Sequence, residues 1–229
     1  SQVVTFDSSV SGATVDITSI SDDTGIFDDD FITQDRALAV NGTLSEALAS
    51  DETLEITWDG GANWHTVLVS GTGWSYDNTA TAHSSNGNIT YQVRVIDDAG
   101  NIGSEDSQEI VVDNKDGRSN TIKITAISGD SGLVGDFITN DTTLTISGTL
   151  SKTKGSAQEV YVSSSTDPSV LLKATVTGKT WTVVDTVSQP GDGEVTYTVI
   201  LSDLAGNIAS QDGQLVTFDT SVSTVINID

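Results

Sequence analysis

The amino-acid sequence repeats itself with a period of 106 residues. Asp7, Asp113 and Asp219 stand at this spacing, residues 31–35 (FITQD) return as 137–141 (FITND), and residues 97–101 (DDAGN) return as 203–207 (DLAGN). A period near a hundred residues is too long for a solenoid unit and suits a whole small domain. We therefore expect two tandem copies of one module. The first covers residues 1–113, with 1–12 as the end of a preceding strand and linker; the second covers 114–219; residues 220–229 begin a third module or form a linker tail.

Short segments within each module alternate between apolar and polar residues. Leu38, Val40 and Leu44 fall on one face of their segment, as do Tyr91 and Val93 of another. This alternation, interrupted about every 8–12 residues by Gly, Asn or Asp, is typical of an antiparallel β-sandwich. The sequence thus predicts an all-β protein of two tandem immunoglobulin-like antiparallel β-sandwiches. The expected strands are 13–20, 37–44, 53–58, 64–70, 73–80, 90–96 and 108–113, repeated as 121–127, 143–150, 158–164, 170–177, 180–187, 195–201 and 214–219.

Aromatic residues recur in step with the repeat. Trp74 and Trp181 align and are expected in the two cores. Tyr91 and Tyr197 stand two positions before a core valine, which resembles the tyrosine corner of immunoglobulin-like sandwiches without its cysteine.

The chain is strongly acidic, and its acidic residues are mostly aspartate. The formal net charge is −24, and 26 of the 33 acidic residues are Asp. This sign of charge opposes phosphate binding, so we expect no nucleic-acid partner. Asp favours turns whereas Glu favours helices. The bias therefore indicates either a soluble acidic surface or divalent cations bound through carboxylate oxygens. The chain has no cysteine and no run of about 20 apolar residues, so we expect neither disulfides nor membrane insertion.

The order of the strands predicts where the acidic turns meet. In an up-and-down count of seven strands, the turn after the first strand lies where the chain leaves the module. The turn before the last strand lies where the chain arrives. Three acidic segments should therefore meet at the joint: the first turn of module 1, the linker and the last turn of module 2. Their residues are Asp22, Asp23, Asp28, Asp29, Asp30 and Asp35; Asp113, Asn114 and Asp116; and Asp203 and Asn207.

Carboxylates gathered in this way repel one another, since two unit charges about 4 Å apart cost about 4 kcal/mol near a protein surface. Ca²⁺ relieves this repulsion with about six to eight oxygen ligands, whereas Mg²⁺ demands an octahedral shell. Both histidines lie outside the repeated turns, so we expect no imidazole-rich metal site. The spacing also differs from that of an EF-hand. The alternative is that these aspartates cap turns by accepting hydrogen bonds from backbone N–H groups.

Three of these features together resemble the bacterial Ig-like repeats of giant, type I-secreted surface adhesins of the biofilm-associated and RTX type. They are the Asp-x-Ala-Gly-Asn turn, the loop at 130–141 and the Val-Asp linker at 112–113. Such repeats are long extenders that hold an adhesive tip away from the cell, with Ca²⁺ at their inter-module joints. The resemblance implies an extracellular, monomeric, non-enzymatic extender at the bacterial cell surface. Its partners would be neighbouring modules of the same chain, and another region would bind the adhesive target.

The resemblance also implies a set of calcium ligands. At the complete joint they are Asp23, Asp30, Asp35, Asp113, Asp203 and Asn207. The half-sites at the two ends would use Asp7, Asp97 and Asn101, and Asp130, Asp136, Asp141 and Asp219. The first turn of module 1 is one residue longer than that of module 2, so Asp28, Asp29 and Asp30 remain alternatives there, and Asp28 is kept in the set.

One hairpin of module 1 suggests a different function. Residues 57–64 (TWDGGANW) resemble the Asp-box hairpin of sialidases, in which Asp closes a turn over a Trp. Trp64 is thus a candidate for stacking on a sugar ring, which makes a carbohydrate-binding module the alternative to an extender; hairpin packing is its other possible role. No nucleophile elbow, phosphate loop or Ser/His/Asp set occurs. Scattered carboxylates leave a glycosidase-type pair open by residue type, but a repeated sandwich suggests no cleft, and we expect no enzyme.

Overall fold

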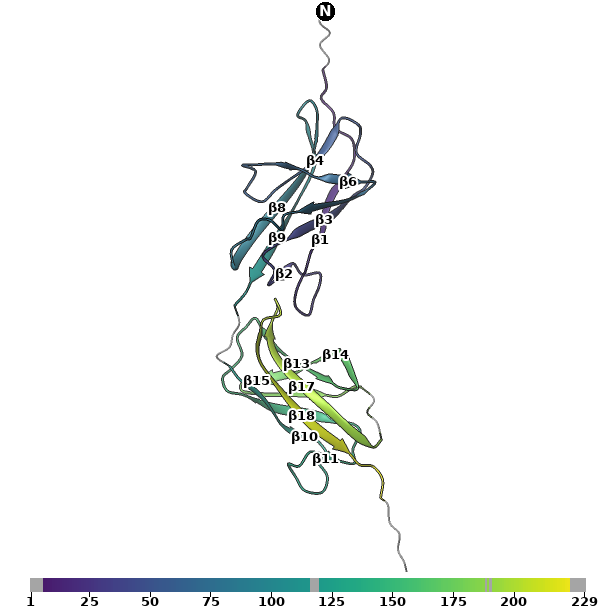
Figure 1. Cartoon of the computed structure of the whole chain (residues 1–229), viewed down its shortest axis with the longest axis vertical. Coiled ribbons are helices and arrows are strands. Elements are labelled where there is room, and N and C mark those ends of the chain that lie inside the picture. Colours follow the sequence, from purple (N-terminus) through teal and green to yellow (C-terminus); the bar gives the residue numbers. More distant parts are fainter. Residues whose placement is uncertain (1–5, 116–119, 188, 190, 223–229) are drawn as a thin grey trace, which may run out of the picture. The chain divides into compact units, whose positions relative to one another are not determined.

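The computed structural model describes residues 6–115, 120–187, 189 and 191–222, and this part of the chain contains strands and turns but no helix (Figure 1). Contacts divide the chain into two compact units, Ser1–Lys115 and Asp116–Asp229. We call them module 1 and module 2. The expected all-β class, with two sandwiches, is confirmed. A search of the described residues for a helix able to cross a membrane found none.

Module 1 consists of a four-stranded and a five-stranded sheet. The first has the order β1-β3-β7-β6 and the second the order β2-β9-β8-β4-β5. The strands of the first sheet are β1 (Val15–Ile20), β3 (Ala39–Leu44), β7 (Gly73–Asp77) and β6 (Leu68–Ser70). Those of the second are β2 (Ile32–Thr33), β9 (Ile102–Asp113), β8 (Asn86–Asp97), β4 (Glu52–Thr57) and β5 (His65–Thr66).

Module 2 repeats this topology strand for strand. Its sheets have the orders β10-β12-β16-β15 and β11-β18-β17-β13-β14. The strands of the first are β10 (Ile122–Ile127), β12 (Thr145–Leu150), β16 (Thr180–Val184) and β15 (Thr175–Thr177). Those of the second are β11 (Ile138–Thr139), β18 (Ile208–Phe218), β17 (Gly193–Asp203), β13 (Gln158–Ser164) and β14 (Asp167–Lys173).

A tryptophan packed on a glycine occupies the core of each module. Trp74 is 4% exposed and Trp181 is 1% exposed, which confirms their expected core positions. A Cβ atom added at Gly42 would lie 2.2 Å from the Trp74 ring and 2.1 Å from the Asp16 carbonyl oxygen. At Gly148 the corresponding distances are 2.5 Å to the Trp181 ring and 1.9 Å to the Lys123 carbonyl oxygen. Each glycine therefore lets the indole pack directly against the backbone of strand β3 or β12.

The last two strands of each module form a hairpin longer than the sequence predicts. The expected ranges 90–96 and 108–113 correspond to β8 and β9, which span Asn86–Asp97 and Ile102–Asp113. In module 2 the ranges 195–201 and 214–219 correspond to Gly193–Asp203 and Ile208–Phe218. Most of the added residues are polar or glycine and are exposed or half-buried, so cross-strand pairing is their main support. The expected single strands 64–70 and 170–177 also each divide between two sheets.

A two-residue strand that the sequence analysis did not predict ties the first long loop to the end of each module. Strand β2 pairs in parallel with β9, with Ile32 opposite Val111 and Thr33 opposite Val112. The Thr33 hydroxyl is buried, donates to the Asp22 carbonyl oxygen at 2.6 Å and accepts the Asp35 N–H at 2.9 Å. Module 2 repeats this arrangement with β11 and β18. The loop is thus fixed beside the point where the chain leaves the module.

Candidate functional site: the acidic poles

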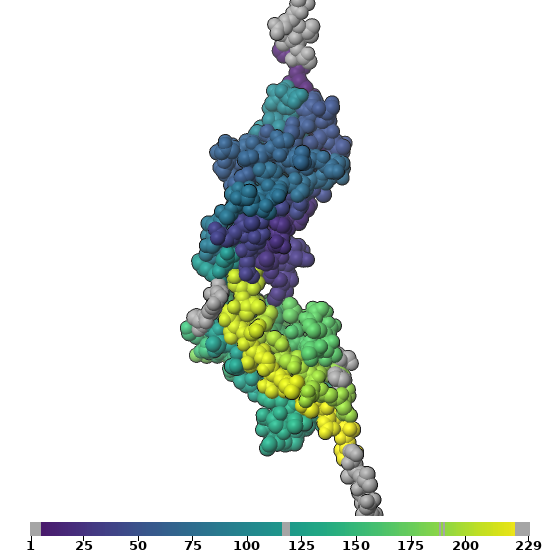
Figure 2. All heavy atoms as spheres, viewed as in Figure 1, coloured from purple at the N-terminus to yellow at the C-terminus, as the bar shows by residue number. Residues whose placement is uncertain are grey.

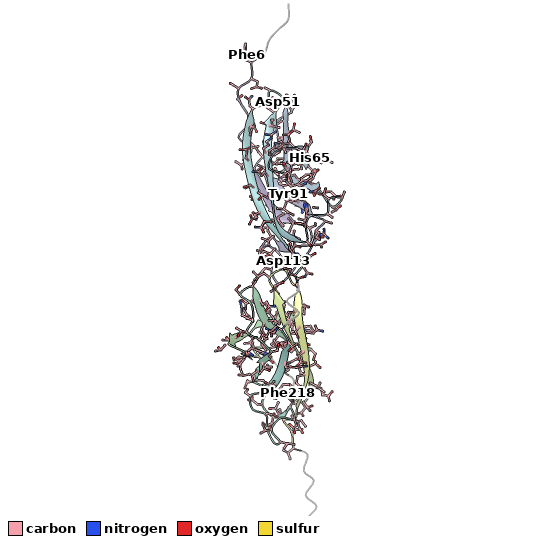
Figure 3. The ribbon with its side chains drawn as sticks, turned by 90° about the vertical axis from the view of Figure 1, so that its left-hand side faces the viewer. Phe6, Asp51, His65, Tyr91, Asp113 and Phe218 are labelled. Atoms are coloured by element: carbon pink, nitrogen blue, oxygen red, sulfur yellow. The ribbon has the colours of Figure 1, made fainter. Side chains whose placement is uncertain are left out.

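We call the end where the chain arrives the N-terminal pole of a module, and the end where it leaves the C-terminal pole. Figure 3 shows Phe6 and Asp51 at one end of module 1 and Asp113 at the other, with Tyr91 between them. The C-terminal pole carries the β1–β3 loop (residues 21–38) and the end of β9. The N-terminal pole carries the β8–β9 turn (residues 98–101) and residues 6–14 before β1, which Figure 2 shows close together.

The C-terminal pole of module 1 holds the departing chain through several hydrogen bonds. The Asn114 N–H donates to the Ser85 carbonyl oxygen at 3.1 Å and to Asn86 Oδ1 at 3.3 Å. The Asn114 side-chain amide donates to the Gln34 carbonyl oxygen. Asp113 therefore lies between the β1–β3 loop and the first residue of β8, which is its cross-strand partner. The predicted linker residue Asp116 lies outside the described residues.

Asp23 holds the β1–β3 loop together but leaves one oxygen unused. Its Oδ2 accepts the Phe31 N–H at 3.0 Å, while its Oδ1 is buried without a hydrogen-bond partner among the described residues. Burial raises the pKa of Asp23, and the nearby carboxyl groups of Asp30, Asp29 and Asp28 raise it further. A negative charge at Asp23 is thus less favourable in the protein than in water.

Module 2 repeats this unpartnered oxygen. Asp130 Oδ2 accepts the Gly135 N–H at 2.6 Å, and Asp130 Oδ1 is buried without a partner in the described structure. Buried polar atoms in proteins are nearly always hydrogen-bonded, so a recurrence at equivalent positions requires an explanation.

An aromatic residue with a strained backbone lies in the same loop as each of these aspartates. Phe31 has φ of 58° and Phe137 has φ of 60°, values that bulky residues rarely adopt. Both rings pack against the core, and both carbonyl oxygens accept a bond of 2.9 Å from the last strand, from Val111 and Thr217 respectively. Core packing and strand pairing therefore hold the loop in a conformation that its backbone alone disfavours.

The other predicted ligands of the first loops cap turns. Oδ1 accepts a backbone N–H two residues further on in Asp30 (3.0 Å), Asp35 (3.0 Å), Asp136 (3.0 Å) and Asp141 (2.8 Å). Hydrogen bonds from Thr143 lower the pKa of Asp141. The turn-capping role that the sequence left as an alternative thus exists at these four positions, and it uses one oxygen of each carboxylate. Asp28 and Asp29 are exposed.

The N-terminal pole of module 1 joins Asp7, Asp97 and Asn101. The Asn101 side-chain amide donates to Asp97 Oδ2 at 2.7 Å and to the Asp7 carbonyl oxygen at 3.3 Å. The Asn101 backbone N–H also donates to Asp97 Oδ1 at 2.8 Å. The side-chain bond from Asn101 is the main cause of the lowered pKa of Asp97.

Module 2 has the same pair at its N-terminal pole. The Asn207 amide donates to Asp203 Oδ2 at 3.0 Å, and its backbone N–H donates to Asp203 Oδ1 at 2.9 Å. In both modules the amide turns its NH₂ group toward the carboxylate. Both side chains could bind one cation only after the amide rotates to present its oxygen.

The three linker aspartates share one local structure. Oδ1 of Asp7, Asp113 and Asp219 accepts the backbone N–H of the second residue onward, at 3.1, 2.9 and 3.4 Å. Within the described residues, no three His, Cys, Asp or Glu side chains form a group that could hold a metal ion. The carboxylates of the predicted ligand set are thus placed in the same loops but do not converge on one point within either module.

Trp64, the candidate sugar platform, is covered on one face. The Arg94 guanidinium carbon lies 3.9 Å from the centroid of the Trp64 ring, and Arg94 forms an ion pair of 2.7 Å with Glu55. A shallow hollow of about 320 Å³ lies beside Trp64, with Gln92 and Glu105 in its lining. Asp59 closes the hairpin, and its bonds from Asn63 lower its pKa to about 2. One face of the Trp64 indole is therefore occupied by the Arg94 guanidinium group of strand β8.

Comparisons with known proteins agree with this architecture. The family described as bacterial Ig-like domain matches residues 9–114 and 118–220. The fibronectin(III)-like modules of Clostridium thermocellum CbhA have a TM-score of 0.53 at 14% identity, over 95% of this chain and 100% of that one. This likeness shows the fold. A search among curated proteins found no match.

Two further solved structures are similar at lower scores. One is a tetra-tandem repeat in the extending region of a large adhesion protein, with 19% identity, a TM-score of 0.29, and coverage of 91% of this chain and 49% of that one. The other is the BSP domain of a biofilm-associated protein, with 20% identity, a TM-score of 0.25, and coverage of 92% and 30%. Because the family match covers both modules almost from end to end, the chain belongs to the bacterial Ig-like domain family, in two tandem copies.

Proposed function

We propose that this chain is part of the extender region of a bacterial cell-surface adhesin, in which Ca²⁺ at the joints between modules stiffens the array. Membership of the bacterial Ig-like family supports the extender part of the proposal, together with the motif resemblance across both modules. In this proposal the chain is extracellular and monomeric. Its partners are neighbouring modules of the same chain, and another region binds the adhesive target.

The unpartnered oxygens of Asp23 and Asp130 are the observation that carries the calcium part. Each is a buried carboxylate oxygen with no hydrogen-bond donor among the described residues, at equivalent places in two modules. A hard divalent cation is the partner that such an oxygen would accept most readily, because Ca²⁺ binds carboxylate and carbonyl oxygens. The raised pKa of Asp23, caused by burial and by its acidic neighbours, favours a positive charge at the same place.

The residues proposed to hold the ion come from the C-terminal pole of one module and the N-terminal pole of the next. They are Asp23, Asp30, Asp35, Asp113, Asp203 and Asn207 at the complete joint, with Asp28 as an alternative. Asp7, Asp97 and Asn101 form one half-site, and Asp130, Asp136, Asp141 and Asp219 form the other. Asp30 and Asp35 use Oδ1 to cap their turns, so the fold positions them while a second oxygen remains for a cation.

The proposed consequence is mechanical. Bound Ca²⁺ would neutralise the carboxylates and link loops of successive modules. Extracellular calcium-binding modules often have a Kd for Ca²⁺ of about 10⁻⁴–10⁻³ M. Calcium at about 10 times its Kd stabilises the folded state by about 1.4 kcal/mol. The Ca²⁺-rich exterior would therefore stiffen the chain, whereas the Ca²⁺-poor cytosol would leave it pliable for export.

Melting curves and small-angle scattering of the whole chain, in chelator and in 10 mM CaCl₂, test the proposal. We expect calcium to raise the melting temperature by about 5–10 °C, since about 1 kcal/mol corresponds to about 4–8 °C for a domain near this size. We also expect the maximum dimension to be better defined in calcium. Equal melting curves and equal dimensions in both buffers would refute the calcium joint.

Matched variants distinguish the loss of a proposed calcium ligand from the loss of any one carboxylate charge. Asp113→Ala and Asp77→Ala each remove one carboxylate that caps a turn, through Lys115 and Thr79 at 2.9 Å each. Only Asp113 belongs to the proposed ligand set, so only its variant should reduce the response to calcium. Asp23→Asn should raise stability in chelator, because it removes a disfavoured charge, and should weaken the response to calcium. Similar responses in all three variants would contradict the assignment.

A further inference from the structure

In module 1 the side chains of Asn78, His83 and Tyr91 form a buried, hydrogen-bonded trio. Asn78 directly follows strand β7. The three side chains are 4%, 8% and 0% exposed. His83 Nε2 lies 2.8 Å from the Tyr91 hydroxyl, and Asn78 Nδ2 lies 2.9 Å from that hydroxyl and 3.4 Å from His83 Nε2. The trio belongs to the β7–β8 loop (residues 78–85) and to the strand that follows it. It therefore determines how this loop closes over the core.

The donors and acceptors of the trio are satisfied only when the His83 ring is neutral. The Asn78 NH₂ group can only donate, so it donates to the Tyr91 hydroxyl and toward His83 Nε2. The Tyr91 hydroxyl proton then points to Nε2, which must be an acceptor. A proton on Nε2 would face two donors and would leave the Tyr91 proton without its acceptor.

The charged surroundings also disfavour a proton on His83. The groups that face it are the Tyr91 hydroxyl, the Asn78 amide and the guanidinium group of Arg36, which donates to the His83 carbonyl oxygen at 2.7 Å. Burial lowers the pKa of His83, and the positive charge of Arg36 lowers it further. A second positive charge in this place would be both desolvated and repelled.

Module 2 provides a natural version without a titrating imidazole. The Asn78 N–H donates to the Leu38 carbonyl oxygen, and the Asp185 N–H donates in the same way to the Leu144 carbonyl oxygen, so Asp185 takes the place of Asn78. Gln189 stands one repeat period after His83. The Tyr197 hydroxyl and the Gln189 amide both donate to Asp185 Oδ2 at 2.5 Å.

We propose that His83 is an acid-sensitive latch of module 1, whose protonation opens the β7–β8 loop while module 2 stays closed. The loop carries Ser85 and leads into Asn86, and these two residues hold the Asn114 N–H at the C-terminal pole. Opening the loop would therefore release the departing chain from module 1. This last consequence bears on the proposed extender function, whereas the latch itself does not depend on calcium.

The sign of the pH dependence follows from linkage. The folded state has a lower His83 pKa than the unfolded state, whose value is near 6.5, so the open state binds more protons in acid. The contribution of the latch is complete above about pH 6.5 and is lost as the pH falls. With one proton taken up, the opening equilibrium rises by at most about tenfold for each pH unit.

Calorimetry of the whole chain in chelator, from pH 7.5 to pH 5, tests the latch. Three of the four tryptophans, Trp58, Trp64 and Trp74, lie in module 1, so tryptophan emission follows mainly module 1 and assigns its transition. We expect the melting temperature of module 1 to fall with pH relative to module 2. His83→Gln, which introduces the residue of module 2, should remove this difference. His65→Gln is the matched control, because His65 is the other histidine and stacks on Trp58 at 4.6 Å.

Direct titration keeps the proposal falsifiable if His83→Gln folds poorly. The chemical shift of the His83 Cε1 proton in the wild-type chain, followed by NMR, should titrate below the ordinary histidine value near pH 6.5. Titration at or above the ordinary histidine value would overturn the latch. So would equal pH dependence in the wild type and in His83→Gln, or loss of the dependence in His65→Gln alone.

Discussion

The two modules have the same sandwich fold, but different polar side chains are buried at the centre of each. In module 1 the Tyr91 hydroxyl is hydrogen-bonded to an imidazole and to an amide. In module 2 the Tyr197 hydroxyl donates to a carboxyl group, which also accepts a bond from an amide. The strand order and the glycine beneath the core tryptophan are the same in both modules. Packing thus defines the repeat, while the buried polar groups are free to vary as long as their hydrogen bonds are satisfied.

The two modules also carry different side chains on the outer surface of the five-stranded sheet. Module 1 has the Trp64–Arg94–Glu55 stack on its five-stranded sheet, and module 2 has Glu159 paired with Lys154 and Lys173. Both arrangements neutralise a glutamate on the central strands of the sheet. The difference indicates that the sheet surface has diverged while the poles have kept their aspartates.

The largest expected effect tests the shared core. Gly42→Ala and Gly148→Ala should each destabilise their own module by about 3 kcal/mol or more, since overpacking a core typically costs about 1–3 kcal/mol and here the clash includes a backbone oxygen. Calorimetry should show one transition shifted in each variant. If either alanine is tolerated while the other is not, the two cores do not pack alike.

An intermediate effect tests the difference between the buried centres. Tyr197→Phe removes a hydrogen bond to a charged partner, which usually contributes about 1.5–3 kcal/mol to the free energy of unfolding. Tyr91→Phe removes hydrogen bonds between neutral groups, which usually contribute about 0.5–1.5 kcal/mol each. Denaturant unfolding near pH 7.5, followed by the tryptophans of each module, measures both. Equal losses would mean that Asp185 gains no more from its tyrosine than Asn78 and His83 gain from theirs.

The two buried tyrosines also predict how the stability of each module changes at alkaline pH. Burial raises the pKa of Tyr91 to about 12; for Tyr197 burial and then Asp185 raise it. Because both folded pKa values exceed the unfolded value near 10, their contribution is complete below about pH 10 and is lost above it. Module 2 should lose more, because ionised Tyr197 would face the negative charge of Asp185.

The smallest expected effect concerns the C-terminal poles. Module 2 has Asp192 where module 1 has Asn86, and each accepts the N–H of the departing chain, from Thr220 at 2.7 Å and from Asn114 at 3.3 Å. Asn86→Asp should change stability in chelator by less than about 0.5 kcal/mol, as is usual for a surface change. It should increase the calcium-dependent rise in melting temperature if the proposed joint is correct, because Asn86 lies opposite Asp113.

Asn88→Asp is the control for this substitution. Asn88 is exposed on the same strand, two residues further along, and pairs with Val111. The same response to calcium in both variants would show a general charge effect and would separate Asn86 from the joint.

The strands and the repeat could be predicted from sequence because their causes are local. Leu38 and Val40 alternate with polar neighbours, and such a period of two suits a strand that is buried on one face. Trp74 and Trp181 could be assigned to the cores because they align at one period of a repeated domain. The full length of β8 and β9 could not be predicted, because their polar ends are held by each other rather than by burial.

The candidate site could be predicted only as a set of loops. Turn chemistry placed Asp23, Asp30 and Asp35 in one segment, and strand parity placed that segment near the departing chain. Parallel pairing of β2 with β9 joins that segment to the departing chain. The segment Ile32–Thr33 is too short to show the alternation that indicates a strand. His83 gave no local signal either, since a single histidine in a Ser- and Asn-rich loop is usually exposed.

The sequence by itself determined the number of modules, the all-β class and the segments in which acidic side chains gather. These follow from a fixed repeat, from alternation along the chain and from the preference of Asp for turns. Tertiary structure alone decided that one oxygen of Asp23 is buried without a partner, that Arg94 covers Trp64, and that Tyr91 meets His83. The physical reason is that burial and hydrogen-bond partners depend on residues distant in sequence, which become neighbours only when the two sheets pack.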